Sequence, residues 1–436
     1  MTPTPENHFT LWTVSYLYPP NYSGAGFQAH REHIRFVRRG VSVKVLAAGD
    51  AGPRTDELED VSIVRFPAIA GSLPAIAKRS QAVAKLWSYI LDNLRSFSFA
   101  AQCTWSILAQ GRRNDIVRFE VPSPYTFIPL LAARGKGMKT ILRMHMYGSD
   151  DPVSILSRVK RGRLPEALTL LSFHLSDAVV PICTAMLESC RKTHIAERKL
   201  KLIRHGSDTE RYQPVDDTER TRLCRLLGMS PEKRYILFVG ETIERKGIDI
   251  LTDAFILLHA HMPDVELLIV GPHEFKQQGI LEEATAAAKT AMVEQCKQAM
   301  TRAGCGDAVH WVGRVENAWD YMKIASLYCF PTRREGLPLV VIEALASGLP
   351  VVISRLEGIT TDLVTPDTGT IVDTFRSEDY ANAMETILAN PAHTAQMRRA
   401  SRQRALSEFS LDGAVEAWLE LVNELLRSGP RSDQPV

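Results

Sequence analysis

The amino-acid sequence predicts an α/β protein built from two doubly wound, mostly parallel sheets. Its 436 residues exceed what one ordinary hydrophobic core organises, and they suit two domains of roughly 200 residues each. Short β-branched apolar runs recur along the chain, and a segment with helical periodicity follows each run. This alternation is typical of parallel strands covered by helices on both faces. The pattern is interrupted at residues 202–217 and then starts again, which indicates two sheets.

The strands follow from the apolar runs in chain order. The first series predicts strands within residues 9–17, 41–49, 115–120, 139–145 and 176–182. The second series predicts strands within residues 234–241, 265–271, 308–313, 327–331, 350–354 and 369–373. Runs of this length and composition are bounded by turn-forming residues, as strands usually are.

Turn formers and charges replace the apolar pattern at 202–217, so we place the domain boundary there. The predicted domains are residues 1–205 and 206–405, followed by a C-terminal amphipathic helix within 406–427 and a disordered tail at 428–436. Residues 274–307 are rich in Ala, Gln, Glu and Lys. They predict one long surface helix or two shorter ones, to which we assign no chemistry.

Charge is distributed unevenly along the chain. Residues 1–200 hold 26 Lys and Arg against 16 Asp and Glu, and the remainder holds 26 against 34, so the halves carry about +10 and −8. A basic first half favours contact with something anionic, such as a membrane surface or a charged acceptor. An uneven distribution of charged side chains over a solvated surface, without any anionic partner, explains the same counts equally well. We expect no nucleic-acid partner.

Cysteines and apolar segments bear on the cellular compartment. The seven cysteines are odd in number and scattered, which is typical of reduced core thiols in a cytosolic protein. The first 20 residues lack a basic stretch followed by a long apolar one, and no later segment approaches about 18 apolar residues. We therefore expect a cytoplasmic protein, with peripheral contact at the inner face of the membrane as an open alternative.

Loops that follow the predicted strands are the places to look for a ligand site, because open parallel sheets bind ligands beyond the carboxyl ends of their strands. The loop at 18–33 has Gly24 and Gly26 just before a helical segment, where backbone N–H groups can approach an anion. The loop at 238–251 has Gly240, then Lys246 at the opening of the next helix, where a phosphate can bind. An ordinary turn explains either loop taken alone.

The segment at 333–352 places two carboxylates eight positions apart in an otherwise apolar run. Glu335 stands at the mouth of a predicted helix, which Gly336, Leu337 and Pro338 open, and Glu343 lies on the helix body. Pro338 fits the first helical turn, where its missing N–H costs nothing. A carboxylate held there can accept both hydroxyls of a ribose diol. A solvated Glu on an exposed stripe is the alternative for this segment alone.

Four stretches occur in a fixed order: VGE followed after five residues by KG, then LLIVG, WVGRV and EGLPLVVIEALASGLPVV. Together they resemble the C-terminal half of the family-4 glycosyltransferases, and the E-x7-E spacing is the most specific part. The N-terminal half is similar more loosely, through its Gly-rich first loop, ILRMH and LIRHGSDTERYQP. The resemblance spans roughly residues 10–425. It implies the GT-B fold, in which two Rossmann-like domains face each other across a cleft and the C-terminal helix returns toward the N-terminal domain.

The resemblance implies roles for particular residues. Glu343 would bind the ribose of a nucleotide-sugar donor, Glu335 would contact the hexose hydroxyls, and His145 would lie beside the donor sugar. Lys246 would bind the diphosphate, helped by the backbone at Gly24 and Gly26. The implied catalytic residues are His145 and Glu335. The implied donor-binding residues are Gly24, Gly26, Gly240, Arg245, Lys246, Arg314, Gly336, Leu337, Leu339 and Glu343. Without the resemblance, a lone His after a strand is more often a structural residue.

The family retains anomeric configuration without a metal, and this chain has no D-x-D after a predicted strand. We therefore expect no metal and no cofactor, since the nucleotide sugar is a substrate. Two positions depart from the family pattern. Glu241 stands where Arg usually provides a second phosphate cation, and Arg245, Arg333 or Arg334 would have to replace it. The hinge carries His205 and Tyr212 where Asn and Phe are common.

The sequence does not identify the acceptor. Residues 72–96 combine Lys78, Arg79 and Lys85 with Trp87 and Tyr89, and residues 157–163 add a basic cluster. A lipid-linked acceptor at an anionic membrane suits these segments, whereas a plain surface helix explains them without any ligand.

The leading hypothesis is a retaining hexosyltransferase that uses a UDP-sugar, with GDP-sugars as the alternative, and acts on a glycan, lipid-linked or small-molecule acceptor. A nucleotide-sugar epimerase or a phosphorylase of the same architecture is a rival. A degenerate, non-catalytic transferase subunit is another, motivated by Glu241.

Overall fold

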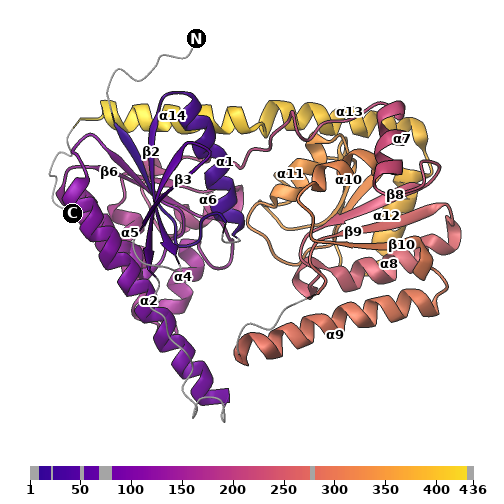
Figure 1. Cartoon of the computed structure of the whole chain (residues 1–436), viewed down its shortest axis with the longest axis horizontal. Helices are drawn as coiled ribbons and strands as arrows, with labels where there is room; N and C mark the ends of the chain where they lie inside the picture. The colour runs from indigo at the N-terminus through magenta and orange to yellow at the C-terminus, as the bar shows by residue number, and fades with distance from the viewer. Residues whose placement is uncertain (1–8, 21–22, 50–53, 68–80, 275–279, 430–436) are drawn as a thin grey trace. The chain divides into compact units, whose positions relative to one another are not determined.

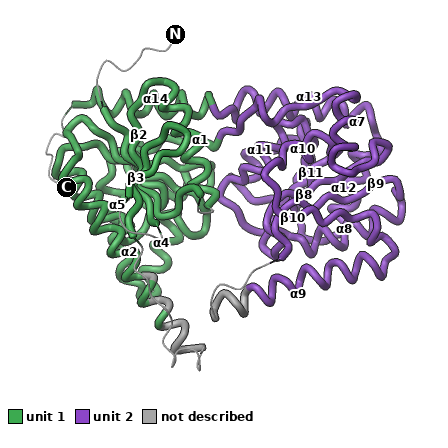
Figure 2. Tube along the Cα trace, viewed as in Figure 1, with its two compact units in different colours: residues 1–205, 412–436 green, residues 206–411 purple. Residues whose placement is uncertain are grey.

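The computed structural model describes residues 9–20, 23–49, 54–67, 81–274 and 280–429. The chain forms two compact units, which Figure 2 shows in green and purple. Unit 1 comprises residues 1–205 and 412–436, and unit 2 comprises residues 206–411. Each unit is described separately below.

Unit 1 contains a seven-stranded sheet in the order β3-β4-β2-β1-β5-β6-β7. Its strands are β1 (Thr10–Val14), β2 (Ser42–Gly49), β3 (Arg54–Leu58), β4 (Val61–Pro67), β5 (Ile116–Phe119), β6 (Lys139–Arg143) and β7 (Ala178–Val180). Its helices are α1 (Gly24–Arg38), α2 (Gln81–Gln110), α3 (Phe127–Gly135), α4 (Pro152–Lys160), α5 (Glu166–Leu175), α6 (Thr184–Lys192) and α14 (Leu411–Arg427), and Figure 1 labels most of them. Each pair of neighbouring strands is parallel except β3 and β4.

The five strands predicted in this unit are confirmed, but the sequence reading missed the β3–β4 hairpin. Leu58 pairs with Val61, so the connection is a two-residue turn. Both turn residues, Glu59 and Asp60, have positive φ, at 49° and 66°. This backbone is that of a type I′ hairpin turn, whose usual sequence signal is Asn-Gly or Asp-Gly. Glu-Asp does not give that signal, which is why the hairpin was not predicted.

Unit 2 contains a six-stranded sheet in the order β10-β9-β8-β11-β12-β13, and every neighbouring pair is parallel. Its strands are β8 (Arg234–Val239), β9 (Val265–Val270), β10 (Val309–Gly313), β11 (Leu327–Phe330), β12 (Val351–Ser354) and β13 (Gly369–Val372). Its helices are α7 (Asp217–Leu226), α8 (Ile248–His261), α9 (Ile280–Arg302), α10 (Ala318–Ile324), α11 (Leu339–Ala346), α12 (Ser377–Leu388) and α13 (Pro391–Glu408). All six predicted strands are confirmed. The long helix predicted within 274–307 is α9.

The C-terminal part differs from the prediction. The predicted amphipathic helix is confirmed as α14, but it begins at Leu411, because residues 406–408 still belong to α13. Unit 2 also extends to residue 411 instead of 405. The reason is a backbone bridge: the Ser207 N–H donates to the Phe409 carbonyl at 2.8 Å, and the Leu411 N–H donates to the Ser207 carbonyl at 2.8 Å. Residues 430–436 of the predicted tail lie outside the described residues.

Helix α14 belongs to unit 1 because its apolar face packs there. Trp418 is buried, and its ring lies 4.8 Å from the guanidinium carbon of Arg118 and 5.1 Å from that of Arg143. An indole ring attracts such cations through its quadrupole. In the first turn of α14, Asp412 pairs with Arg39 at 2.9 Å.

Two further expectations concern the whole chain. All seven cysteines are free and buried, which confirms their assignment as core thiols. Within the described ranges, none of the helices combines the length and the apolar character that a membrane crossing needs.

Candidate functional site

In unit 2, glycines bring the carboxyl ends of β8 and β9 unusually close together. Gly240 and Gly271 have φ of +152° and +145°, in the region that favours glycine. A Cβ built on Gly271 would lie 1.9 Å from the Gly240 carbonyl oxygen. No residue with a side chain fits at Gly271, so the backbone position at which the loop after β8 begins is fixed.

Gly247 fixes the end of the same loop. Its φ is +77°, and a Cβ there would lie 1.9 Å from the carbonyl oxygen of Pro331 in the loop after β11. The two loops are also joined by the Arg333 N–H, which donates to the Arg245 carbonyl at 2.8 Å. Close backbone contact therefore sets Arg245 and Lys246 against the segment that leads to Glu335.

Glu335 is held by three donors. It is only 4% exposed, and its Oε1 accepts from Lys246 Nζ at 2.6 Å, from Thr332 Oγ1 at 2.9 Å and from Arg245 at 3.3 Å. All three contacts involve Oε1 and not Oε2. Burial lowers the pKa of Lys246, and the neighbouring Glu335 acts in the opposite direction. Two cations therefore surround one carboxylate, and one positive charge is left to attract an anion.

Glu343 lies on α11, five positions into the helix. The side chain is buried, with 5% exposure, among Val341, Ile342, Ala344 and Leu345, which are fully buried. Pro338, which was predicted to lie in the first helical turn, is the N-cap with an extended backbone (φ −69°, ψ 105°), and the helix begins at Leu339. Gly336 and Leu337 are buried in the turn that precedes it. Because Glu343 is buried, the alternative of a solvated Glu on an exposed stripe of the helix is wrong.

The charge reversal at Glu241 has a partner that sequence reasoning missed. Lys289, on α9, donates to Glu241 Oε1 at 2.6 Å, and both side chains are about one third exposed. The two residues are 48 positions apart, and nothing in the sequence signals their contact. Of the proposed substitutes for the missing Arg, Arg245 contacts Glu335, whereas Arg333 pairs with Asp249 at 2.6 Å.

The remaining predicted residues of unit 2 are more dispersed. Arg314 follows the edge strand β10, and β9 and β8 stand between that strand and β11. Arg314 is exposed, and Leu339 is half-buried. The structure thus brings Arg245, Lys246 and Glu335 into direct contact and keeps Glu343 on the adjoining helix.

Unit 1 contains the Gly-rich first loop. Ser23 caps α1 and accepts from the Gly26 N–H at 3.3 Å. A Cβ on Gly26 would lie 2.4 Å from the Leu17 carbonyl oxygen, so glycine is required there, whereas a Cβ on Gly24 would meet nothing within 4 Å. The expected contact of this backbone with a diphosphate stays a prediction.

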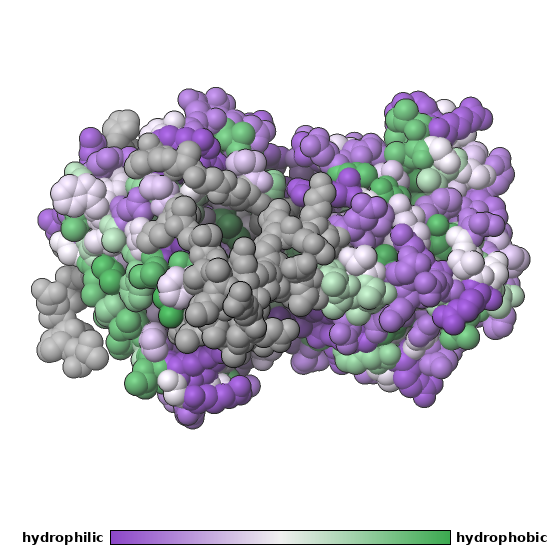
Figure 3. Space-filling view, turned by 60° about the horizontal axis from the view of Figure 1, so that its bottom comes forward, coloured by the Kyte–Doolittle hydropathy of each residue, from purple (hydrophilic) through white to green (hydrophobic). Residues whose placement is uncertain are grey.

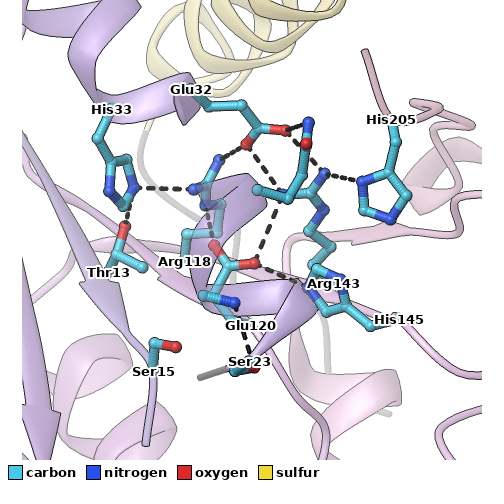
Figure 4. A network of polar contacts seen from close by, with 12 residues as sticks. Thr13, Ser15, Ser23, Glu32, His33, Arg118, Glu120, Arg143, His145 and His205 are labelled. Atoms are coloured by element: carbon cyan, nitrogen blue, oxygen red, sulfur yellow. Dashed lines mark hydrogen bonds and ion pairs between the residues drawn. The ribbon is translucent and has the colours of Figure 1, made fainter. Parts of the chain in front are cut away.

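A buried polar network lies behind this loop (Figure 4). Glu32 pairs with Arg143 at 2.8 Å and with Arg118 at 3.0 Å. Glu120 pairs with Arg118 at 2.6 Å and with Arg143 at 3.5 Å. All four side chains have 0% exposure. Two carboxylates and two guanidiniums therefore balance each other, which is the condition for burying charge.

His145 is attached to this network. Its Nε2 lies 2.9 Å from Glu120 Oε2, so Nε2 carries a proton that it donates to the carboxylate. Its Nδ1 is buried and has no hydrogen-bond partner among the described residues. The ring stacks on His205, with centroids 5.6 Å apart. His145 thus has one nitrogen bound to Glu120 and one buried nitrogen without a partner among the described residues.

Electrostatics fix the charge states around His145. Burial raises the pKa of Glu120, but Arg118 and Arg143 outweigh it, and the pKa lies below its usual value. Burial and then Arg143 lower the pKa of His205 well below its usual value, so that ring is neutral. His205 Nδ1 accepts from Arg143 at 3.4 Å. No three His, Cys, Asp or Glu side chains within the described part of the chain are grouped as ligands of one metal ion.

Solved structures with the same architecture decide the fold. Anabaena Alr3699/HepE, crystallised with UDP, matches with a TM-score of 0.71 and 16% identity, over 95% of this chain and 100% of that chain. Sucrose-phosphate synthase from Thermosynechococcus elongatus matches with a TM-score of 0.73 and 17% identity, over 97% and 100%. The protein has the GT-B fold. Each of its two units is one Rossmann-like domain of that fold.

Sequence comparisons add a family match within unit 2. Residues 225–404 match the family model described as Glycosyl transferases group 1. A relative is the lipopolysaccharide core biosynthesis mannosyltransferase LpsB of Rhizobium meliloti (strain 1021), 27% identical over 233 residues, or 52% of this GT-B chain and 61% of LpsB. The chain spans between about half and two thirds of the length of the curated relatives that it matches. The matched segment contains Lys246, Glu335 and Glu343.

Proposed function

We propose that this protein is a retaining, metal-independent glycosyltransferase of family 4. It moves a hexose from a nucleoside-diphosphate sugar to a hydroxyl of a glycan, lipid-linked or small-molecule acceptor. The observation that carries the proposal is Glu335, held by Lys246, Arg245 and Thr332 eight residues before the buried Glu343. A UDP-sugar is favoured over a GDP-sugar, because a GT-B neighbour of this chain was crystallised with UDP.

Recognition of the donor rests on the two carboxylates. Glu343 accepts the two ribose hydroxyls, since an ionised carboxylate has two acceptor oxygens for a vicinal diol. Glu335 accepts hydroxyls of the hexose with Oε2, because Oε1 already takes the three protein donors. A carboxylate whose Oε1 is held by three donors has a fixed orientation, so Oε2 can orient the sugar before reaction.

Departure of the nucleoside diphosphate requires positive charge near the phosphates. The bond from C1 to the phosphate oxygen breaks and its electron pair stays on that oxygen, while the acceptor oxygen bonds to C1 and its proton passes to the departing phosphate. Lys246 and Arg245 supply two cations against the single charge of Glu335. Cations placed before the reaction stabilise charge that develops during it.

His145 is proposed to contact the reacting sugar. Its Nε2–H is committed to Glu120, so Nδ1 accepts a hydrogen bond from a sugar hydroxyl. Glu120 acts as a positioning residue that fixes the ring through this bond.

Contact with an anionic membrane at the cytoplasmic face is part of the proposal. In unit 1, Lys160, Arg161 and Arg163 are exposed around Leu164, which is 72% exposed. Basic residues beside an exposed apolar side chain suit an anionic bilayer surface. Lys78 and Arg79 lie outside the described residues. Co-sedimentation with phosphatidylglycerol vesicles, lost with Lys160→Glu/Arg161→Glu or at high salt, tests this contact, and equal binding to neutral vesicles contradicts it.

The Glu241–Lys289 pair bears on the degenerate-subunit alternative. That alternative was motivated by an acidic residue where a phosphate cation is usual. Because Lys289 neutralises Glu241, the loop after β8 does not present a net negative charge from this pair. This supports an active enzyme over a non-catalytic subunit.

The first experiment measures thermal stabilisation by UDP, GDP, ADP and their common sugars. A ligand at 100 times its Kd stabilises by about 2.7 kcal/mol, which is readily detected as a rise in Tm. One nucleotide series is expected to stabilise the wild type and not Glu343→Ala. Glu378→Ala, an exposed carboxylate on α12, is the matched control and is expected to behave as wild type. Equal stabilisation of Glu343→Ala would remove the ribose assignment.

Turnover is then measured with the nucleotide sugar so identified, in the presence of EDTA. We expect nucleoside diphosphate to be released. We also expect NMR to show that the new linkage has the same anomeric configuration as the donor sugar. Isomerised donor without an acceptor would indicate the epimerase alternative, and a requirement for free phosphate would indicate a phosphorylase.

A further inference from the structure

A cavity in unit 1 points to the chemical class of the acceptor. We propose that it binds an alkyl chain, so that the acceptor hydroxyl belongs to a lipid-linked or alkyl-bearing molecule. The role of the bound molecule as an acceptor rests on the proposed function. The binding of an alkyl chain is argued only from the residues in and around the cavity.

The cavity lies at the carboxyl ends of β1 and β5 and is closed on one side by α2. Its volume is about 320 Å³, and its apolar lining includes Val14, Phe99, Ala100, Phe119, Val121 and Pro129. This volume is at the lower end of the range for small-molecule sites. At roughly 30 Å³ for each water-sized group, it holds about ten heavy atoms.

The cavity is unsuited to a bare sugar. None of the described residues that line it is charged. The polar side chains that line it largely bond within the protein. Ser15 donates to the Leu17 carbonyl at 2.9 Å, Thr126 to the Val121 carbonyl at 3.2 Å, and Ser123 lies 3.0 Å from Thr126. A sugar would leave its hydroxyls without such partners, which costs free energy, whereas an alkyl chain needs none.

The cavity adjoins the residues proposed to contact the reacting sugar. Phe119 and Val121 line it, and Glu120 between them bonds to His145 at 2.9 Å. Alternate residues of an extended segment point to opposite sides. An apolar chain in the cavity is therefore separated from the Glu120–His145 pair by only the backbone at the end of β5. Ser23 and Ala25 of the Gly-rich loop line the same cavity.

A second observation is independent of the cavity and also indicates an apolar ligand. Along α2, Trp87, Ile90, Leu94 and Phe97 are all exposed, at 36%, 37%, 49% and 50%. Their spacing of three, four and three residues places them on one face of the helix. The face leads to the cavity, because Phe97 packs edge-on against Tyr125, which lines it, with ring centroids 4.8 Å apart.

Other exposed apolar side chains lie on neighbouring elements of unit 1: Trp105 and Leu108 on α2, and Ile128 and Leu131 on α3. Figure 3 shows hydrophobic residues gathered on the left side of the view, over this unit. Water-exposed apolar surface of this extent beside an uncharged cavity suits a chain that is longer than the cavity.

The test measures binding of n-alkyl glucosides with chains of two to twelve carbons to the full-length protein, below their micelle concentrations, by calorimetry. We expect affinity to rise about fourfold for each methylene until about ten carbons, because burying one methylene is worth about 0.8 kcal/mol. Affinity that does not depend on chain length, or equal binding of phenyl glucoside or free glucose, would overturn the alkyl assignment.

Variants locate the site. Val121 is 46% exposed, so Val121→Asp places a charge at the cavity mouth without burying it, and at least a tenfold loss of octyl glucoside affinity is expected. Val153→Asp makes the same change at a residue of α4 that is 40% exposed and does not line the cavity, and it is expected to bind as wild type. Unchanged affinity in Val121→Asp, or equal loss in both variants, would contradict the assignment.

The outcome separates this inference from the proposed function. Donor binding is measured on the same variants with the nucleotide that stabilises the wild type. Chain-length-dependent glucoside binding without any nucleotide binding would leave the cavity assignment standing and would reject the glycosyltransferase. Nucleotide binding and sugar transfer, with glucoside affinity that does not depend on chain length, would support the glycosyltransferase and would reject the cavity assignment.

Discussion

Removal of Glu120 is the sharpest test of the buried network in unit 1. Glu32 and Glu120 balance Arg118 and Arg143, and all four side chains have 0% exposure. Glu120→Ala leaves two buried guanidiniums facing one carboxylate, a net charge of +1 without water. Breaking a buried ion pair in this way costs about 3–5 kcal/mol. That is a fifth or more of the roughly 5–15 kcal/mol by which a domain is stable.

The loss is measured as a shift in the unfolding transition of unit 1. At about 2–4 °C per kcal/mol for a domain of this size, Tm is expected to fall by roughly 6–20 °C. Trp418 packs on Arg118 and Arg143, so its fluorescence reports this region. The control is Glu59→Ala, which removes a carboxylate that is 61% exposed and pairs with His30. It is expected to cost less than about 1 kcal/mol. A loss below about 1 kcal/mol in Glu120→Ala would refute the reasoning.

The same residue predicts a pH dependence. The pKa of Glu120 lies below its usual value, because Arg118 and Arg143 outweigh the effect of burial. A carboxylate with a depressed folded-state pKa contributes stability that is complete above its unfolded pKa, about 4.3, and is lost as the pH falls through the lower folded pKa. Glu120→Gln lacks this contribution, so its stability is expected to fall less steeply than that of wild type below about pH 4. If the stabilities of wild type and Glu120→Gln fell equally steeply below about pH 4, the lowered pKa of Glu120 would be contradicted.

Three further predictions concern unit 2. Glu335→Ala is expected to lower kcat at least 100-fold with donor affinity changed by less than about tenfold, measured by steady-state kinetics; a loss in affinity alone would contradict its role. Lys289→Ala is expected to weaken donor binding by on the order of tenfold because it exposes the charge of Glu241, and Glu241→Ala/Lys289→Ala is expected to restore it; no restoration would mean that Lys289 acts otherwise. Gly247→Ala is expected to destabilise unit 2 by more than about 2 kcal/mol in urea unfolding, because both its φ and the Pro331 carbonyl exclude a side chain. Gly228→Ala, at φ +71° with nothing within 4 Å, is the control and is expected to cost only about 1 kcal/mol; equal losses would show that the close approach has no effect.

The C-terminal helices show what periodicity alone leaves open. The amphipathic pattern predicted a helix near the C-terminus but not its unit; only the family resemblance implied that this helix returns toward the N-terminal domain, and α14 belongs to unit 1 whereas α13 belongs to unit 2. That division depends on Ser207 bonding to the Phe409 and Leu411 backbone, and on Trp418 packing against two guanidiniums. Each of these contacts joins residues about 200 or more positions apart, and no local pattern encodes them.

The sequence by itself determined the α/β class and eleven of the thirteen strands in the described part of the chain, and through the family resemblance it pointed to Arg245, Lys246 and Glu335, but not to Thr332, which also contacts Glu335. Apolar runs and glycines next to strand ends are local signals, and the carboxyl ends of parallel strands necessarily meet at one edge. Only the tertiary structure decided that Lys289 neutralises Glu241, that Arg118 and Arg143 are buried between two carboxylates, and that an uncharged cavity lies beside Glu120. Charges and apolar groups in a sequence do not reveal which of them share a buried space, because pairing and burial depend on distance in the fold and not along the chain.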